Sequence, residues 1–244
     1  MKKIAVIGGS GLDSPEILEG PVEKSVRNSY GSPSSPLVCG KIGGVDVVIL
    51  ARHGKDHSVP PTQINFRANL RALKDEGCTH ILAATAVGSL REEIKPGNLV
   101  FPSQFIDFTR LREMTFFTDE VVHTPMSEPY DKRLRDILCR GCEALGLAYN
   151  RDVTVITIEG PRFSTKAESR LFRSWGADII NMSSCPEVIL ANELKIPYQT
   201  LAMSTDYDCW KANEKPVTYD RVMALMKQNA EKVKKLLLRA IREI

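Results

Sequence analysis

Residues 196–210, IPYQTLAMSTDYDCW, join an apolar run with strand character to a pair of aspartates. Because strand and helix patterns alternate along the rest of the chain, this run is expected to be a buried strand of an α/β sheet. In open sheets of this kind, ligands bind beyond the carboxyl ends of the strands. Asp206 and Asp208 are therefore either solvated turn residues or residues of a binding site.

Apolar periodicity predicts the remaining strands and the helices that cover them. Strands are expected at residues 2–8, 38–42, 45–50, 80–86, 152–160 and 177–182, with two short ones within 99–107. Helices are expected at residues 62–77, 131–145, 164–176, 183–195 and about 218–244. Periodicity fades between 108 and 129. The order of elements predicts a single α/β domain over residues 1–244, with a mixed central sheet flanked by helices on both faces.

Turn and capping residues support these boundaries. The glycine pair at 43–44 separates two apolar runs and can adopt positive φ, which predicts an antiparallel hairpin. Thr165 and Glu168 have the spacing of a capping box at the start of a helix. Ser184 and Glu187 have the same spacing, so a second capping box is expected there.

The composition favours a small-molecule partner. The 244 residues include 33 basic and 30 acidic ones, a formal charge of +3, and 43% are hydrophobic. No basic cluster suggests a nucleic-acid footprint. The first apolar run, residues 4–7, is too short for a signal sequence or a membrane span. We therefore expect a cytoplasmic protein without nucleic-acid or membrane partners.

Cysteine and histidine spacing gives little support for a metal or redox centre. Cys139 and Cys142 form one C-x-x-C on a predicted helix face, and no second pair completes a zinc site. A structural role is favoured for them over redox chemistry. His53 and His57 are four residues apart, but a glycine and two prolines nearby argue against the helix that such a metal site needs. No metal is expected.

Groups that could bind an anion follow three of the predicted strands. The loop 8–13, GGSGLD, offers flexible backbone N–H groups, although Ser14 breaks the dinucleotide fingerprint. Two interpretations of residues 8–13 stay open, a simple turn and a phosphate-binding loop. Arg52 and His53 end a second strand, and Thr85 ends a third. Because the ends of strands in one sheet can converge on one crevice, these donors suggest an oxyanion site.

Two further segments could contact an organic ligand. Phe163 and Ser164 lie just before a predicted helix, where the ring could stack on a planar base, although a core position is more common for phenylalanine. The stretch 181–184, NMSS, offers amides and hydroxyls suited to sugar hydroxyls. No G-x-S-x-G elbow or other nucleophile signature is found, which disfavours acyl-enzyme chemistry.

Seven segments together are specific enough to indicate a family. They are GGSGLD (8–13), ARHG (51–54), TAVGSLREEIKPG (85–97), HTPMSEPY (123–130), EGPRFS (159–164), WGADIINMS (175–183) and STDYDCW (204–210). This set resembles the 5′-methylthioadenosine phosphorylases of the trimeric purine nucleoside phosphorylase family, over nearly the whole chain. The resemblance implies that inorganic phosphate displaces adenine from C1′ of S-methyl-5′-thioadenosine. It also implies a homotrimer or dimer of trimers, a role in purine and methionine salvage, and no metal or organic cofactor.

The same resemblance assigns site residues by position. Phosphate would be held by Ser10, Arg52, His53, Thr85, Ala86 and Ser183. Met182 would contact the ribose through its backbone, and His123 would reach the 5′ group of a substrate in a neighbouring subunit. The base would lie beside Phe163, Ser164, Asp206 and Asp208.

Asp208 resembles the acid that assists purine departure at N7, and Asp206 the residue that recognises the exocyclic amine. An acid that donates must keep its proton near neutral pH, which needs burial or a neighbouring carboxylate.

Other activities remain open at this stage. A phosphorylase for adenosine, methylthioinosine or 6-oxopurine nucleosides is the main alternative, and the two aspartates argue against the 6-oxopurine form. A nucleotide-binding regulator and a nicotinamide dehydrogenase are weaker alternatives. Some family members continue past the position of Ile244 with an extension that helps to close the 5′ pocket. We therefore expect a more open pocket that also accepts adenosine.

Overall fold

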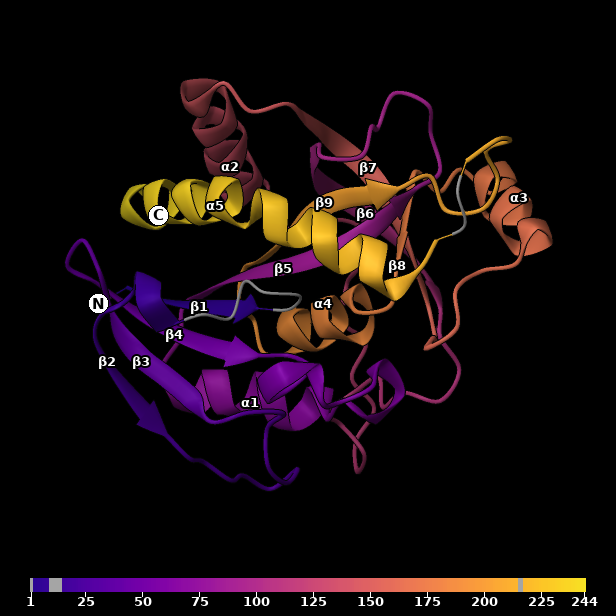
Figure 1. Ribbon diagram of the computed structural model, residues 1–244. Coiled ribbons are helices and arrows are strands. Elements are labelled where there is room, and N and C mark those ends of the chain that lie inside the picture. Colours follow the sequence, from indigo (N-terminus) through magenta and orange to yellow (C-terminus); the bar gives the residue numbers. More distant parts are fainter. Residues whose placement is uncertain (1, 9–14, 215–216) are drawn as a thin grey trace.

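The computed structural model describes residues 2–8, 15–214 and 217–244 (Figure 1). The strands are β1 (Lys3–Gly8), β2 (Glu19–Lys24), β3 (Leu37–Ile42), β4 (Val45–Ala51), β5 (His80–Ser89), β6 (Leu99–Phe108), β7 (Tyr149–Ile158), β8 (Ile179–Asn181) and β9 (Tyr198–Asp206). The helices are α1 (Phe66–Asp75), α2 (Lys132–Leu145), α3 (Lys166–Ser174), α4 (Ser184–Glu193) and α5 (Tyr219–Glu243). Short 3₁₀ turns occupy Pro15–Ile17, Lys55–His57 and Pro61–Gln63.

The described strands form one mixed sheet in the order β2-β3-β4-β1-β5-β8-β7-β6-β9. Strand β9 also pairs with β5, so β5, β8, β7, β6 and β9 close into a ring. The β1–β4, β1–β5 and β5–β9 pairs are parallel, whereas β5–β8 and β6–β9 are antiparallel. The ring brings the carboxyl ends of β5 and β9 together, which places the segment after β9 at the edge of a crevice.

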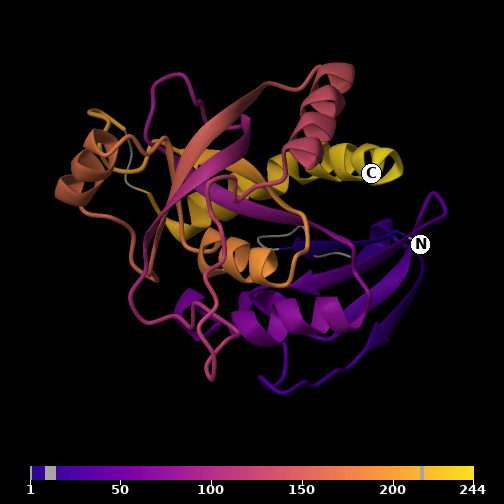
Figure 2. The ribbon, with the colours of Figure 1, turned by 180° about the vertical axis from the view of Figure 1, so that it is seen from behind.

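Helices cover both faces of the sheet, as the sequence predicts. Helices α1 and α4 lie against one face, and α2 and α5 lie against the other (Figures 1 and 2). The alternating side chains of β1 divide between the two cores, because Ala5 and Ile7 pack toward α1 and α4 while Ile4 and Val6 pack toward α2 and α5. The predicted mixed α/β fold is confirmed.

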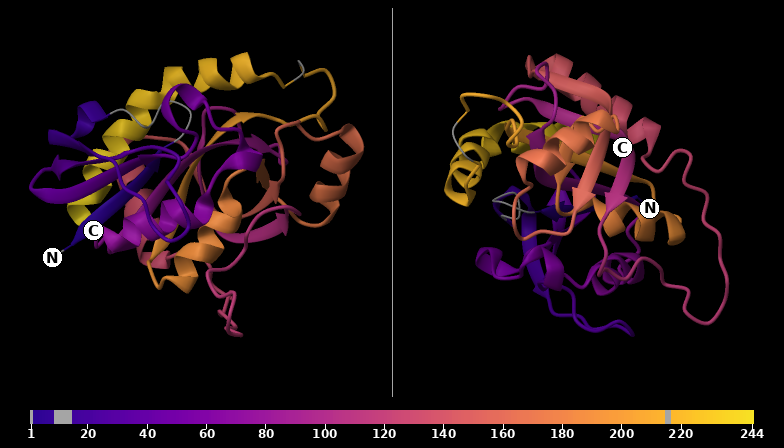
Figure 3. Two further views of the ribbon diagram at one scale, coloured as in Figure 1. Left: turned by 90° about the horizontal axis from the view of Figure 1, so that it is seen from below. Right: turned by 90° about the vertical axis from the view of Figure 1, so that its right-hand side faces the viewer.

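Two peripheral features surround this body. Helix α3 packs at one end through Phe172, in a smaller cluster with Ile156 and Leu90. The connection 109–131, between β6 and α2, has no helix or strand and extends away from the sheet (Figure 3). This is the region where periodicity fades in the sequence.

Two expectations about the strands were wrong, and one strand was missed. Residues 99–107 form one strand, β6, because its pairing with β7 continues past Pro102 through a shift of register. A proline cannot donate to the ladder, and the shift accommodates it. Strand β7 begins at Tyr149, earlier than residue 152. Strand β2 was not predicted, because all six of its residues are exposed and its sequence, EGPVEK, has no apolar alternation.

The capping residues gave one correct and one incorrect expectation. Thr165 and Glu168 form the complete capping box at the start of α3. The second box is absent, because the Ser184 hydroxyl accepts a hydrogen bond from the Asn181 amide and Glu187 pairs with a buried arginine. The glycines at 43–44 both have positive φ, and the hairpin between β3 and β4 is confirmed.

Candidate functional site

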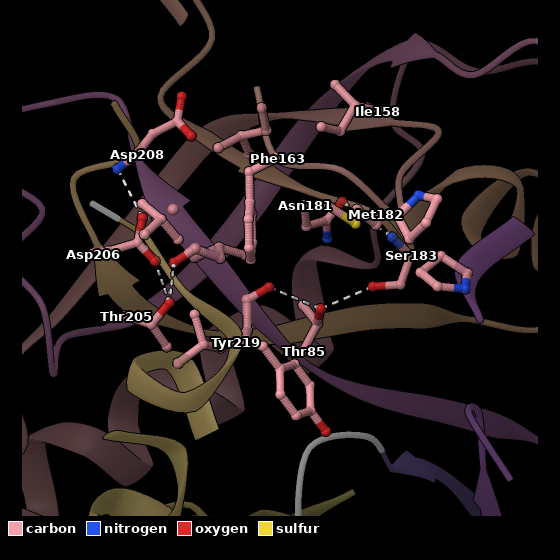
Figure 4. A pocket seen from close by; sticks show the side chains of 18 of the residues that line it. Thr85, Ile158, Phe163, Asn181, Met182, Ser183, Thr205, Asp206, Asp208 and Tyr219 are labelled. Atoms are coloured by element: carbon pink, nitrogen blue, oxygen red, sulfur yellow. Dashed lines mark hydrogen bonds between the residues drawn. The ribbon is translucent and has the colours of Figure 1, made fainter. Parts of the chain in front are cut away.

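A pocket of about 300 Å³ lies at the carboxyl ends of β5, β8 and β9. The first turn of α5 and the loops that contain His53 and Phe163 complete its walls. Figure 4 shows Asp206 and Asp208 at one side of this pocket and Thr85 and Ser183 at the other. The topology therefore gathers most of the residues implied by the family resemblance around one cavity.

The acidic side of the pocket is formed by the neighbouring carboxyl groups of Asp206 and Asp208. Asp208 is 6% exposed, and its backbone N–H donates to Oδ1 of Asp206 at 2.7 Å. The Thr205 hydroxyl donates to the other Asp206 oxygen at 2.7 Å. Burial raises the pKa of Asp206, although these two hydrogen bonds act in the opposite direction. Burial thus favours the protonated form of Asp206 relative to an exposed aspartate.

Ser164 fixes the side chain of Asp208. Its hydroxyl lies 2.8 and 2.9 Å from the two carboxylate oxygens. Asp208 itself has φ of 48°, a left-handed conformation that its N–H bond to Asp206 helps to hold. Neither aspartate is a solvated turn residue, so the alternative left open by the sequence is excluded.

The wall beside the aspartates is apolar and closely packed. Phe163 is 41% exposed and lines the pocket, so it is not a core residue. Gly88 allows β5 to approach Asp206, since a Cβ at this position would lie 3.1 Å from Asp206 Oδ1 and 3.0 Å from Ile180 Cγ2. The Phe163 ring lines the same pocket as the aspartates, so a planar heterocycle bound there could stack on it.

The opposite side of the pocket presents small polar groups. The Thr85 and Ser183 hydroxyls are 2.8 Å apart, and both residues are nearly buried. Ala86 and His53 also line this side. Burial, with the nearby charge of Arg52, lowers the pKa of His53 to about 3, so its imidazole is neutral near pH 7.

Arg52 lies behind this polar wall and does not line the cavity. It is 2% exposed, and its Nε and Nη2 donate to the two oxygens of Glu187 at 2.8 Å each. Its Nη1 donates to the Ala84 carbonyl at 2.8 Å, which ties the end of β4 to β5 across β1. The Tyr198 hydroxyl donates to Glu187 at 2.7 Å.

Glu187 was missed because its spacing from Ser184 suggested a helix cap. Its charge directly before the apolar run VILA in the helix SCPEVILANE was the signal that could have revealed a buried ion pair.

The segment after β8 holds Met182 against the pocket. Asn181 anchors this segment through its side chain, since Oδ1 accepts a hydrogen bond from Thr157 Oγ1 at 3.0 Å and Nδ2 donates to Ser184 Oγ at 2.7 Å. The pocket also has an apolar end that sequence reasoning did not identify. That end includes Pro60, Pro61, Val217, Tyr219, Val222 and Met223.

Among the described residues, Arg52 and His123 were expected in the site but do not line the pocket of their own chain, Arg52 because its guanidinium is turned to Glu187. Ser10 lies outside the described residues. His123 is exposed in the connection 109–131 and does not line the cavity of its own chain.

The remaining histidines and cysteines form no metal centre in the described part of the chain. His53 and His57 stack with ring centroids 4.0 Å apart. Cys139 and Cys142 are buried in α2 and unbridged, and burial raises the pKa of Cys142 to about 12. Across residues 2–8, 15–214 and 217–244, no group of three or more His, Cys, Asp or Glu side chains is placed to hold a metal ion. No helix in the same residues could span a membrane.

Comparisons with known proteins agree with this geometry. The model of the phosphorylase superfamily matches residues 3–242. S-methyl-5′-thioadenosine phosphorylase of Xenopus tropicalis is 54% identical over 249 residues, covering 99% of this chain and 89% of the relative. The corresponding protein of Danio rerio is 51% identical, with the same coverage of both chains.

The fold is also found in solved structures. The methylthioadenosine phosphorylase of Schistosoma mansoni in complex with adenine superposes with a TM-score of 0.96 at 39% identity, covering 100% of this chain and 92% of that one. A Ser-to-Thr mutant of the same organism's adenosine/methylthioadenosine phosphorylase, in complex with methylthioadenosine, has a TM-score of 0.94 at 38% identity, covering 100% of this chain and 91% of that one. The chain therefore belongs to the phosphorylase superfamily, in the group of S-methyl-5′-thioadenosine phosphorylases.

Proposed function

We propose that this protein catalyses the phosphorolysis of S-methyl-5′-thioadenosine to adenine and S-methyl-5-thioribose 1-phosphate. The observation that carries the proposal is one pocket with neutral hydrogen-bonding groups for an oxyanion on one side and two neighbouring carboxyl groups on the other. The names of the relatives, at about half identity across the chain, support the same activity. Inorganic phosphate serves as co-substrate, and no cofactor is required.

On the polar side, we assign phosphate to Thr85, Ala86, Ser183 and His53. Arg52 supports this wall from behind, with Glu187 offsetting its charge. Phosphate held here lies below C1′ of the ribose and attacks it as the bond to the purine breaks. Positive charge that develops at C1′ is stabilised by the adjacent anion. Met182, which lines the pocket, contacts the ribose.

On the acidic side, we assign the purine to the space between Phe163 and the aspartates. Asp208 donates a proton toward N7, so that adenine leaves as a neutral molecule and not as an anion. Asp206 accepts from the exocyclic amine. The hydroxyl of Ser164 and the N–H bond between the aspartates hold this arrangement in place before substrate binds. General acid assistance of this kind is worth about 10² to 10⁴ in rate.

The apolar end of the pocket accounts for the 5′ substituent. Tyr219, Val222 and Met223 contribute side chains at the start of α5, next to Pro60 and Pro61. A methylthio group buries apolar surface there that a 5′-hydroxyl does not, which favours methylthioadenosine over adenosine. Adenosine is a second substrate, processed less efficiently.

We further propose that the chain functions as a homotrimer, or a dimer of trimers, in the cytoplasm. His123 cannot serve its own pocket from its exposed position, and it lies beside exposed Val121 and Val122. In a trimer, the connection 109–131 brings His123 to the 5′ end of a neighbour's site. Residues 1–244 act as one catalytic domain in purine and methionine salvage.

A substrate panel tests the proposal. Purified protein is incubated with methylthioadenosine, adenosine or inosine, each with and without phosphate, and the free base is quantified by chromatography. The expected result is rapid, strictly phosphate-dependent release of adenine from methylthioadenosine, slower release from adenosine, and little hypoxanthine from inosine. Release of base at equal rates without phosphate would refute a phosphorylase.

A further inference from the structure

His53 is held in one orientation by its own loop. Its Nδ1 lies 3.0 Å from the carbonyl oxygen of Val59, and the Val59 N–H donates to the His53 carbonyl at 2.8 Å. Gly54 makes this compact loop possible, since its φ is 69° and a Cβ would come within 3.0 Å of Val59 Cγ2. Two hydrogen bonds between the same pair of residues fix the direction of the imidazole.

The bond to Val59 also fixes the tautomer. A backbone carbonyl only accepts hydrogen bonds, so Nδ1 must carry a hydrogen. The charged and titratable groups around the ring, Arg52, His57 and Arg112, together with burial, oppose a second proton, and they lower the pKa of His53 to about 3. Near neutral pH, Nε2 therefore carries a lone pair and can only accept a hydrogen bond.

His53 differs in this respect from the other groups on the polar wall. The Thr85 and Ser183 hydroxyls can turn to donate to any oxyanion. An accepting nitrogen can bind only an anion that brings its own hydrogen. Hydrogen phosphate and hydrogen arsenate carry a hydroxyl near neutral pH, whereas sulfate has the same tetrahedral shape and carries none.

We propose that His53 determines which oxyanion the pocket accepts, by receiving a hydrogen bond from the hydroxyl of hydrogen phosphate at Nε2 and thereby disfavouring sulfate. This inference rests on the proposed function for the location of the phosphate. It adds that the subsite selects by protonation state and not by shape and charge alone. Sulfate in this position would place an oxygen lone pair against the lone pair of Nε2.

Titration calorimetry of the full chain with phosphate, arsenate and sulfate near neutral pH tests the inference. Phosphate and arsenate should bind tighter than sulfate by about 10- to 100-fold, the range for a buried polar group left without its partner. In His53→Gln, the amide can turn its N–H groups toward the anion. In His53→Asn, the shorter side chain can keep the bond to Val59 without reaching the anion. Both variants should bind phosphate and sulfate with similar affinities.

Thr85→Val is the matched control. It removes a hydroxyl from the same wall, so it should weaken both anions and keep their ratio. Equal binding of sulfate and phosphate by the unaltered protein, or an unchanged ratio in both His53 variants, would overturn the inference. The two proposals can fail independently. A protein that discriminates between these anions but releases no adenine would refute the enzymatic activity and leave the inference about His53 intact.

Discussion

Removal of the Glu187 carboxylate should destabilise the protein strongly, although Glu187 does not line the pocket. The side chain is fully buried and accepts three hydrogen bonds, two from Arg52 and one from Tyr198. Glu187→Ala leaves the 2%-exposed guanidinium without its counter-ion. Loss of one partner of a buried ion pair costs about 3–5 kcal/mol. Because folded proteins are stable by only about 5–15 kcal/mol, this is a large share of the total.

Urea unfolding followed by circular dichroism measures this cost. Asp75→Asn is the control, because it breaks the exposed pair with Arg71 and should cost no more than about 0.5 kcal/mol. The double variant Arg52→Met with Glu187→Leu should recover most of the stability, since replacement of both charges by apolar groups is often neutral. It should nevertheless bind phosphate more weakly, because the polar wall has lost its support. A Glu187→Ala midpoint within the error of the unaltered protein would refute the reasoning.

Three other predictions concern the pocket and its pH dependence. Gly88→Ala should lower turnover and reduce the free energy of unfolding by about 1–3 kcal/mol, because the new Cβ would press on Asp206 and Ile180. Steady-state kinetics measures the first effect, and thermal unfolding measures the second. Phe163→Ala should raise the KM for methylthioadenosine by about tenfold through lost stacking, with the KM for phosphate as the internal control. Stability should fall as the pH drops from 6.5 toward 3, because the unfolded chain protonates the His53 imidazole and the folded chain does not. His53→Asn should lower that slope by up to about 1.4 kcal/mol per pH unit in chemical unfolding, and equal slopes would contradict the burial of a neutral imidazole.

The sequence predicted the sheet and the acidic side of the site because both depend on local patterns. The stretch 204–210 follows a long apolar run, and its position at a strand end made a binding site one of two alternatives for Asp206 and Asp208, which the family resemblance then favoured. The capping box of α3 is likewise local. Periodicity also located the helices on both faces.

The remaining features depend on contacts between distant segments. Glu187 and Arg52 are 135 residues apart, and only the folded sheet shows that a helix-start glutamate neutralises a strand-end arginine. The exposure of Phe163 depends on where its loop lies relative to β9. The apolar end of the pocket combines the loop after β4 with the start of α5, a pairing that no single stretch of sequence reveals.

The central claim is that Asp208 protonates the departing purine while phosphate attacks from the opposite side of the sugar. Single-turnover rates of base release test it with two substrates, methylthioadenosine and its N7-methyl derivative, whose positively charged base leaves without a proton. Asp208→Asn should slow the first reaction by at least about a hundredfold and the second by less than about tenfold. An equal loss on both substrates, or near-normal rates on methylthioadenosine, would contradict the assignment of Asp208 as the acid.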